Sequence, residues 1–93
     1  MLSANSYFDN AVQSVAFARH GRRQTVGVIA PGRYHFGTEA AERMTVVSGA
    51  LRIQLDGQED WQIYPQGTSF EVAAESGFEV EVTECAAYWC EYL

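Results

Sequence analysis

The chain has 93 residues, of which 47% are hydrophobic and 19% are charged, so its composition is that of a globular protein and not of a disordered one. Its formal net charge is −6, and all six basic residues are arginines. This balance argues against nucleic acid as a partner, because a polyanion needs a run of phosphate contacts, whereas one or two arginines can hold a single phosphate or a nucleoside.

Residues 1–93 are predicted to form one domain, since neither half of so short a chain could build a workable core. A domain of this size buries only about 60–65% of its unfolded surface, so we expect a homodimer that covers more apolar area. No apolar run approaches the ~20 residues of a membrane helix, and the stretch Met1–Asn5 lacks the features of a signal peptide. Cys85 and Cys90 would lie about 16 Å apart on an extended strand, so we expect reduced thiols and a cytoplasmic protein with no membrane contact.

The first third of the chain predicts a β-hairpin. Residues 12–18 and 24–30 have the composition of strands, and the basic stretch 19–23 is expected to form a five-residue loop between them. On the first of these strands, Val15 and Phe17 share one face. A short segment before the hairpin is expected to pack onto the core through two aromatic residues, Tyr7 and Phe8.

The rest of the chain continues as short alternating segments separated by turns. A turn at Pro31-Gly32 leads into a strand at 33–38, in which Tyr34, Phe36 and Thr38 share a face. One helical turn is possible at 39–43. Further strands are predicted at 44–47, 50–55, 61–64, 69–73, 78–82 and 88–93. About nine short strands in all indicate an all-β sandwich or barrel.

Two stretches of this pattern resemble the two motifs of the cupin superfamily. Gly32, Glu42 and Gly49 stand at positions of the first motif, and Pro65 and Gly67 at positions of the second. The resemblance implies a cupin fold, that is, a double-stranded β-helix or jelly-roll barrel.

The histidines of the cupin motifs have no counterpart here. With three residues between the His-x-His pair and the glutamate, the pair falls on Phe36 and Thr38; with four, it falls on His35 and Gly37. We prefer the first register because Phe36 and Thr38 share a face with Tyr34. Phe70 takes the place of the remaining histidine. The cupin metal centre would then be replaced by aromatic and hydroxyl groups, and no metal is expected.

A closer resemblance covers nearly the whole chain. It is carried by the segments Thr25–Val28, Pro31–Thr38, Met44–Leu51, Asp60–Gly67 and Tyr88–Leu93. These segments resemble the pyrimidine/purine nucleoside phosphorylases, which are small single-domain cupin proteins. The resemblance implies an enzyme of nucleoside salvage, a pentosyltransferase that cleaves diverse pyrimidine and purine nucleosides with inorganic phosphate. The products would be the free base and ribose 1-phosphate, and phosphate would be a co-substrate, with no cofactor.

Four residues are candidates for the phosphate and the sugar. Arg23 and Thr25 could bind phosphate through a forked guanidinium and a hydroxyl, although a basic turn is more often a solvated loop. Glu42 could accept hydrogen bonds from ribose or donate a proton; alternatively it is paired with an arginine such as Arg43 or Arg52. Thr38 could touch ribose or phosphate, or be an ordinary strand residue.

Aromatic residues are the candidates for binding the base by stacking. Stacking tolerates any base, because every base has a π-face. Most of them could equally be core residues, and the cupin motif position favours Phe70. The candidates are Tyr34, Phe36, Trp61, Phe70 and Tyr88. The two histidines, His20 and His35, are expected at a turn and on an outward face, and with the two cysteines they match no zinc pattern.

Two other classes of function remain open on the sequence. A small-molecule-binding cupin without catalysis is the main alternative. A metal-dependent dioxygenase or isomerase is disfavoured by the missing histidines.

Overall fold

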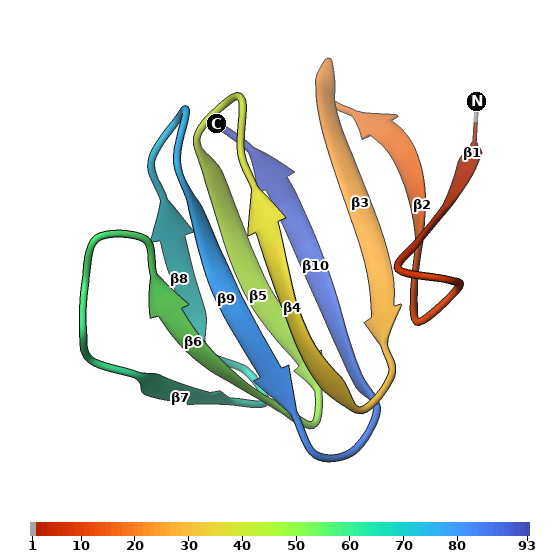
Figure 1. Cartoon of the computed structure of the whole chain (residues 1–93). Coiled ribbons are helices and arrows are strands. Elements are labelled where there is room, and N and C mark those ends of the chain that lie inside the picture. The colour runs from red at the N-terminus through yellow and green to blue at the C-terminus, as the bar shows by residue number, and fades with distance from the viewer. Residues whose placement is uncertain (1) are drawn as a thin grey trace.

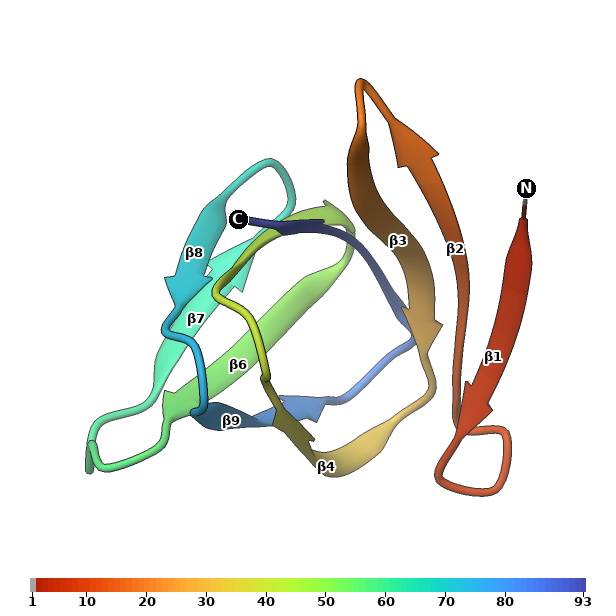
Figure 2. The same ribbon diagram turned by 90° about the horizontal axis from the view of Figure 1, so that it is seen from above.

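The computed structural model describes residues 2–93, which form ten antiparallel strands in two sheets (Figure 1). The strands are β1 (Ser3–Tyr7), β2 (Val12–Arg19), β3 (Arg22–Ile29), β4 (Gly32–Gly37), β5 (Glu42–Ser48), β6 (Ala50–Leu55), β7 (Gln62–Pro65), β8 (Ser69–Val72), β9 (Gly77–Val82) and β10 (Ala86–Tyr92). The six-stranded sheet has the order β1-β2-β3-β10-β5-β8, and the four-stranded sheet has the order β4-β9-β6-β7. Seen from above, most of the strands surround a common centre (Figure 2). The predicted all-β class is confirmed.

No helix forms within residues 2–93, so the helical turn considered at 39–43 is absent. A short bend at residues 39–40 leads directly into β5, which starts at Glu42, two residues earlier than expected. Glu42 therefore lies on a strand, where its pairing with Tyr92 of β10 and Val72 of β8 fixes its position. The described part of the chain contains no helix that is long and apolar enough to cross a membrane.

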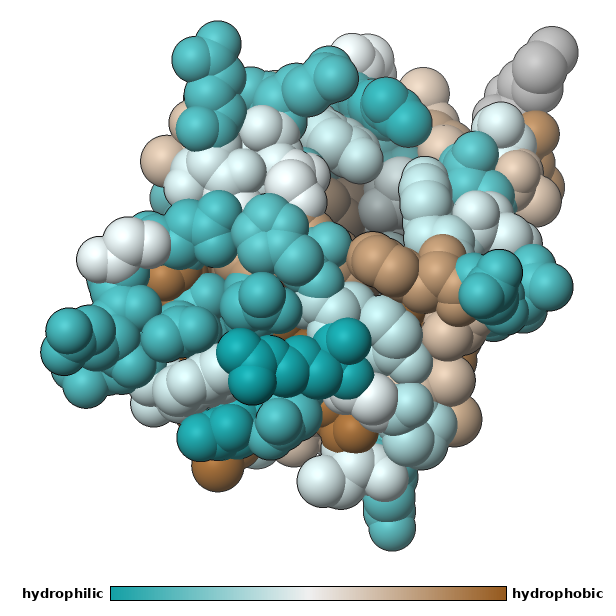
Figure 3. Space-filling view, in the orientation of Figure 1, coloured by the Kyte–Doolittle hydropathy of each residue, from teal (hydrophilic) through white to brown (hydrophobic). Residues whose placement is uncertain are grey.

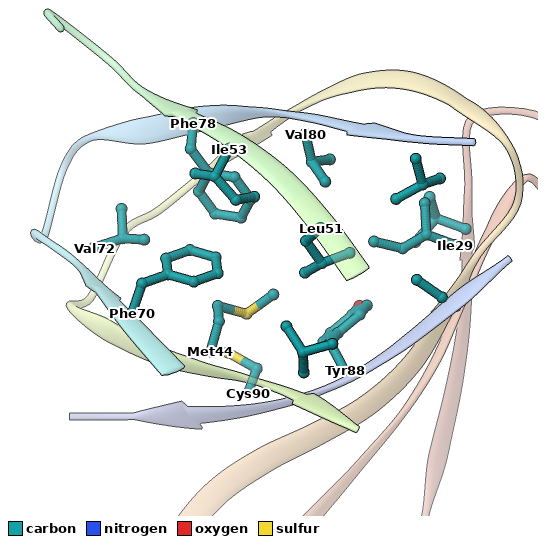
Figure 4. Packing of buried hydrophobic residues seen from close by; sticks show 14 residues of the cluster. Ile29, Met44, Leu51, Ile53, Phe70, Val72, Phe78, Val80, Tyr88 and Cys90 are labelled. Atoms are coloured by element: carbon teal, nitrogen blue, oxygen red, sulfur yellow. The ribbon is translucent and has the colours of Figure 1, made fainter. Parts of the chain in front are cut away.

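The core lies between the two sheets and follows from the period-two alternation of apolar residues. In β9, Phe78, Val80 and Val82 are buried, while Glu79 and Glu81 between them are partly exposed. Figure 4 shows side chains of both sheets pointing toward one another; among them are Met44, Phe70, Tyr88, Leu51, Ile53 and Phe78. The face of the molecule seen in Figure 3 is mainly hydrophilic, as expected for the outward side chains of such strands.

The hairpin of β2 and β3 has a shorter turn than the sequence predicts. Its two turn residues, His20 and Gly21, have φ values of 54° and 72°, and Arg19 pairs directly with Arg22. Positive φ at both central residues is the signature of a type I′ turn, whose twist matches that of the flanking strands. The expected five-residue loop was wrong, and Arg23 consequently lies on β3 and not in a solvated loop.

The face of β2 that turns inward is made of smaller residues. Val12, Ser14 and Ala16 are buried, whereas Val15 and Phe17 share the outer face. Next to Ser14, on the neighbouring strand β3, a large ring leaves room only for a glycine. A Cβ atom on Gly27, which pairs with Ser14, would come within 2.5 Å of the Tyr88 side chain.

Candidate functional site

A cavity of about 230 Å³ opens between the inner face of the six-stranded sheet and strand β4. Inward-facing residues of β2, β3, β5 and β10 form one wall, and β4 together with the turn after β1 forms the other. Five of the predicted site residues line it, from four different strands: Arg23, Thr25, Phe36, Glu42 and Tyr88. Apolar side chains occupy the space between the two sheets beside it (Figure 4).

Glu42 is the carboxylate of this cavity. It is half-buried, and the thiol of Cys90 donates a hydrogen bond to its Oε1 over 3.3 Å. Burial raises the pKa of Glu42, and this effect outweighs the opposing influences of the Cys90 hydrogen bond and of the positive charge of Arg23. A carboxyl group of this kind can hold a proton closer to neutrality than an exposed one.

Cys90 is a buried partner of Glu42 and not a reactive thiolate. Burial raises the pKa of its thiol strongly, and the negative charge of Glu42 raises it further. The thiol therefore stays protonated and acts as a hydrogen-bond donor. Cys85 and Cys90 are both free, as the sequence predicts, and only Cys85 is exposed.

Arg23 provides the positive charge of the cavity. Its guanidinium carbon lies 5.0 Å from the centre of the Tyr92 ring, an arrangement in which the ring face attracts the cation. The ion pairs within residues 2–93 engage other arginines, among them Arg43 with Glu71 and Arg52 with Glu81. The sequence left open an ion pair between Glu42 and Arg43 or Arg52. That alternative is wrong, because both arginines bind other carboxylates.

Aromatic rings form the apolar side of the cavity. Phe36 lies 5.2 Å from Phe78, measured between ring centroids, and meets Tyr88 edge-on at 6.3 Å. Burial raises the pKa of the Tyr88 hydroxyl well above its usual range, so the phenol stays neutral. Phe36 and Tyr88 can thus offer ring surface to a ligand without carrying charge.

Two other predicted site residues, Thr38 and Phe70, do not line the cavity. The Thr38 hydroxyl donates to the carbonyl of Ala73 over 2.7 Å and accepts from the amide of Ser76 over 3.0 Å, so it ties β4 to the loop before β9. Phe70 is 7% exposed and packs against Tyr64 and Phe78 in the core. Phe70 therefore points inward, as the motif resemblance implies, but its neighbours are apolar core residues.

The structure also places Tyr34 and Trp61 away from the cavity. The Tyr34 hydroxyl donates to the carbonyls of Ala30 and Pro31, at 2.9 and 3.0 Å, and closes the turn before β4. Trp61 lies on the outer side of the four-stranded sheet, where the guanidinium carbons of Arg33 and Arg52 are 4.9 and 4.4 Å from its ring centroid. Both side chains are explained by these structural contacts.

Several residues of the cavity were not predicted as site residues. Tyr7 and Phe8 come from the end of β1 and the turn after it, Ser14 from β2, and Cys90 and Tyr92 from β10. They reach one cavity because β2, β3, β10 and β5 are neighbours in the sheet, although β10 is far from the other three strands in the sequence. Alternation along β10 would have shown that Tyr88, Cys90 and Tyr92 share a face, but not what that face meets.

The positions that the cupin resemblance assigns to metal ligands do not fit a metal ion. Phe36 and Phe70 have no donor atoms, the Thr38 hydroxyl is engaged by backbone groups, and Glu42 is a single carboxylate. His35, the alternative ligand, instead places its Nε2 3.0 Å from the carboxylate of Asp56 at the edge of the cavity. No group of three or more potential side-chain ligands occurs among residues 2–93.

The fold is all-β and cupin-like. The EutQ protein of Clostridium difficile shares this fold with a TM-score of 0.72, at 16% identity over 87% of this chain and 67% of that one. A protein of unknown function from Vibrio parahaemolyticus is much more similar. Its crystal structure matches with a TM-score of 0.97 at 49% identity, and the match covers 100% of this chain and 99% of that chain.

The family follows from the sequence comparison. The model of the family "Pyrimidine/purine nucleoside phosphorylase" matches residues 2–92. A protein of that name from Sorangium cellulosum is 62% identical over 93 residues, covering 100% of both chains, and one from an Anaeromyxobacter strain is 56% identical. The chain belongs to the pyrimidine/purine nucleoside phosphorylase family.

Proposed function

We propose that this protein cleaves the N-glycosidic bond of pyrimidine and purine nucleosides with inorganic phosphate, releasing the free base and ribose 1-phosphate. The observation that carries this proposal is the lining of one cavity. It joins a guanidinium group, Arg23, to a carboxyl group whose pKa is raised by burial, Glu42, and to the uncharged rings of Phe36 and Tyr88. Membership of the family supports the same reaction.

Phosphorolysis needs a bound phosphate close to the anomeric carbon of the sugar. Arg23 is exposed at the cavity and can present several N–H donors to the phosphate oxygens, with the Thr25 hydroxyl two residues along the same face of β3. The phosphate oxygen forms the new bond to the anomeric carbon while the bond to the base nitrogen breaks, and the base leaves with that electron pair. Positive charge near the phosphate holds the nucleophile in place.

In this proposal, Glu42 serves the sugar or the departing base. When ionised, it can accept hydrogen bonds from the ribose hydroxyls and stabilise the positive charge that develops on the sugar. When protonated, it can supply the proton that the base needs as it leaves. Its hydrogen bond from Cys90 holds the carboxyl group in one orientation in either case.

The arrangement of strands supports the further proposal that the barrel is a jelly roll. The strand orders β3-β10-β5-β8 and β4-β9-β6-β7 are those of two interleaved four-stranded sheets, with β1 and β2 added at one edge. In this scheme the cavity lies inside the barrel, next to the added hairpin.

The deciding experiment incubates the purified protein with uridine and with adenosine, each with and without phosphate, and identifies the products by chromatography. We expect free base and ribose 1-phosphate only when phosphate is present. Release of base and free ribose without phosphate would identify a hydrolase. If the nucleosides bind but are not cleaved, the protein is a non-catalytic binding module.

A further inference from the structure

Phe8 stands out among the cavity residues because its position is conformationally costly. Phe8, Asp9 and Asn10, in the turn between β1 and β2, have φ values of 53°, 54° and 70°. Left-handed backbone is unfavourable for any residue with a side chain, and a bulky residue such as phenylalanine rarely adopts it. Such strain persists only where other contacts hold it, and it is concentrated at functional sites.

The strained turn places the Phe8 ring at the cavity. The ring centroid of Phe8 lies 5.0 Å from that of Tyr34 and 6.1 Å from that of Phe36. The planes of Phe8 and Phe36 are only 19° apart, so the two rings are nearly parallel. Phe36 is fixed on β4 against the core, whereas Phe8 is 47% exposed on a turn.

From this geometry we propose that Phe8 and Phe36 form an aromatic clamp for the base of the nucleoside, with Phe36 as the fixed side and Phe8 as the movable side. This proposal rests on the proposed function. A flat heterocycle in contact with both rings needs about 7 Å between the ring planes, which is more than the present centroid separation of 6.1 Å, so Phe8 has to move outward to admit the base. The exposed turn can allow such a movement without disturbing the core.

The clamp also explains how one cavity could accept both classes of base. Neither phenylalanine ring has a hydrogen-bond donor or acceptor, so stacking between them does not read the edge of the base. Stacking grows with the area of the heterocycle. Removing Phe8 therefore weakens the binding of purine nucleosides more than that of pyrimidine nucleosides.

The test compares Phe8→Ala, Phe8→Leu and Phe8→Trp with the wild-type protein, using inosine and uridine as nucleosides. We expect Phe8→Ala to raise the KM for the nucleoside about tenfold, more for inosine than for uridine, and to leave the KM for phosphate unchanged. Phe8→Leu should raise the KM for the nucleoside as much as Phe8→Ala does. Leucine retains apolar volume, but it has no π-face on which a base can stack. Phe8→Trp should keep the wild-type KM or lower it.

Phe17→Ala is the matched control, since it removes the same ring from the outer face of β2, where the residue pairs with Gln24. It should leave both KM values unchanged. If folded Phe8→Ala has the wild-type KM, or if Phe8→Leu is fully active, Phe8 is only an apolar cover and the clamp is refuted.

Direct binding separates this proposal from the reaction itself. Calorimetric titration with inosine in the absence of phosphate measures binding without turnover. If the wild-type protein binds inosine without cleaving it in any buffer, and Phe8→Ala loses that binding, the clamp stands and the proposed reaction fails. If the wild-type protein cleaves inosine and Phe8→Ala binds it equally well, the reaction stands and the clamp fails.

Discussion

Arg23 and Arg22 are adjacent residues on β3 whose side chains point to opposite faces of the sheet, so they form a natural pair for mutation. Arg23→Ala removes the guanidinium from the cavity, and Arg22→Ala removes the same charge from the outer side. We expect Arg23→Ala to raise the KM for phosphate at least tenfold, as the loss of a charge-assisted hydrogen bond of about 1.5–3 kcal/mol predicts. Steady-state kinetics with varied phosphate measures this change.

Arg23→Lys extends the test, because it keeps the charge but not the forked donors. Its KM for phosphate should lie between those of the wild-type protein and Arg23→Ala. Equal phosphate KM values for Arg23→Ala and Arg22→Ala would show that Arg23 does not bind phosphate.

Glu42 makes the stability of the fold depend on pH. Burial raises its pKa in the folded protein, so its ionisation destabilises the folded state relative to the unfolded chain. This penalty is absent below the unfolded pKa of about 4.3 and is complete above the folded pKa. Glu42→Gln should therefore be more stable than the wild-type protein at pH 8, and the difference should shrink as the pH approaches 4.

Urea unfolding of the wild-type protein and Glu42→Gln at several pH values measures this difference. Glu59→Gln, in the exposed loop before β7, is the control for loss of one negative charge. If the difference in unfolding free energy between the wild-type protein and Glu42→Gln does not change with pH, ionisation of Glu42 does not destabilise the folded state.

At the scale of elements, the hairpin of β2 and β3 matters most because β3 presents Arg23 and Thr25 to the cavity. Its type I′ turn contains His20 at φ 54°, a conformation that asparagine adopts at lower cost. His20→Asn should stabilise the fold by about 0.5 kcal/mol, which corresponds to roughly 2–4 °C in Tm for a domain of this size.

Thermal unfolding monitored by circular dichroism measures the effect of His20→Asn. Gly21→Ala, at φ 72°, is the opposite variant and should lower Tm. A lower Tm for His20→Asn would show that the histidine makes contacts that outweigh its backbone preference.

At the scale of the whole molecule, the outer face of β1, β2, β3 and β10 has a region without charge. Val15, Val26 and Val28 are 39–50% exposed there, and the cross-strand row Ala4, Val15, Val26 and Trp89 contains no ionisable group. Two copies of a chain with net charge −6 repel each other, so an uncharged apolar face is the favoured place for them to meet. We propose that a second copy of this chain covers it.

Val26→Glu tests this homodimer. Light scattering after size-exclusion chromatography should give twice the chain mass of 10.3 kDa for the wild-type protein and the monomer mass for Val26→Glu. Ile63→Glu, which places the same charge at an exposed position of β7 in the other sheet, should remain dimeric. A monomeric wild-type protein would refute the proposal.

Local patterns in the sequence were sufficient for much of the architecture. The alternation at 50–55 and 78–82 predicted β6 and β9, because a strand with one buried face repeats every two residues. The Asp56-Gly57 turn was also predictable, since Gly57 adopts the positive φ of 83° that such turns need. In β2, by contrast, both faces carry apolar residues, Val12 and Ala16 on one and Val15 and Phe17 on the other. Alternation alone therefore could not predict which face is buried.

The sequence by itself determined that this chain is an all-β protein of a recognisable family, because strand periodicity, turn residues and family resemblance are all properties of the linear chain. Only the tertiary structure decided which side chains share the cavity. It brought Arg23, Glu42 and Tyr88 together with Phe8, and it sent Phe70 to the core and Trp61 to the outside. The physical reason is that the cavity arises from pairing between strands that are distant in sequence. The packing of one sheet against the other then determines which residues each aromatic ring contacts.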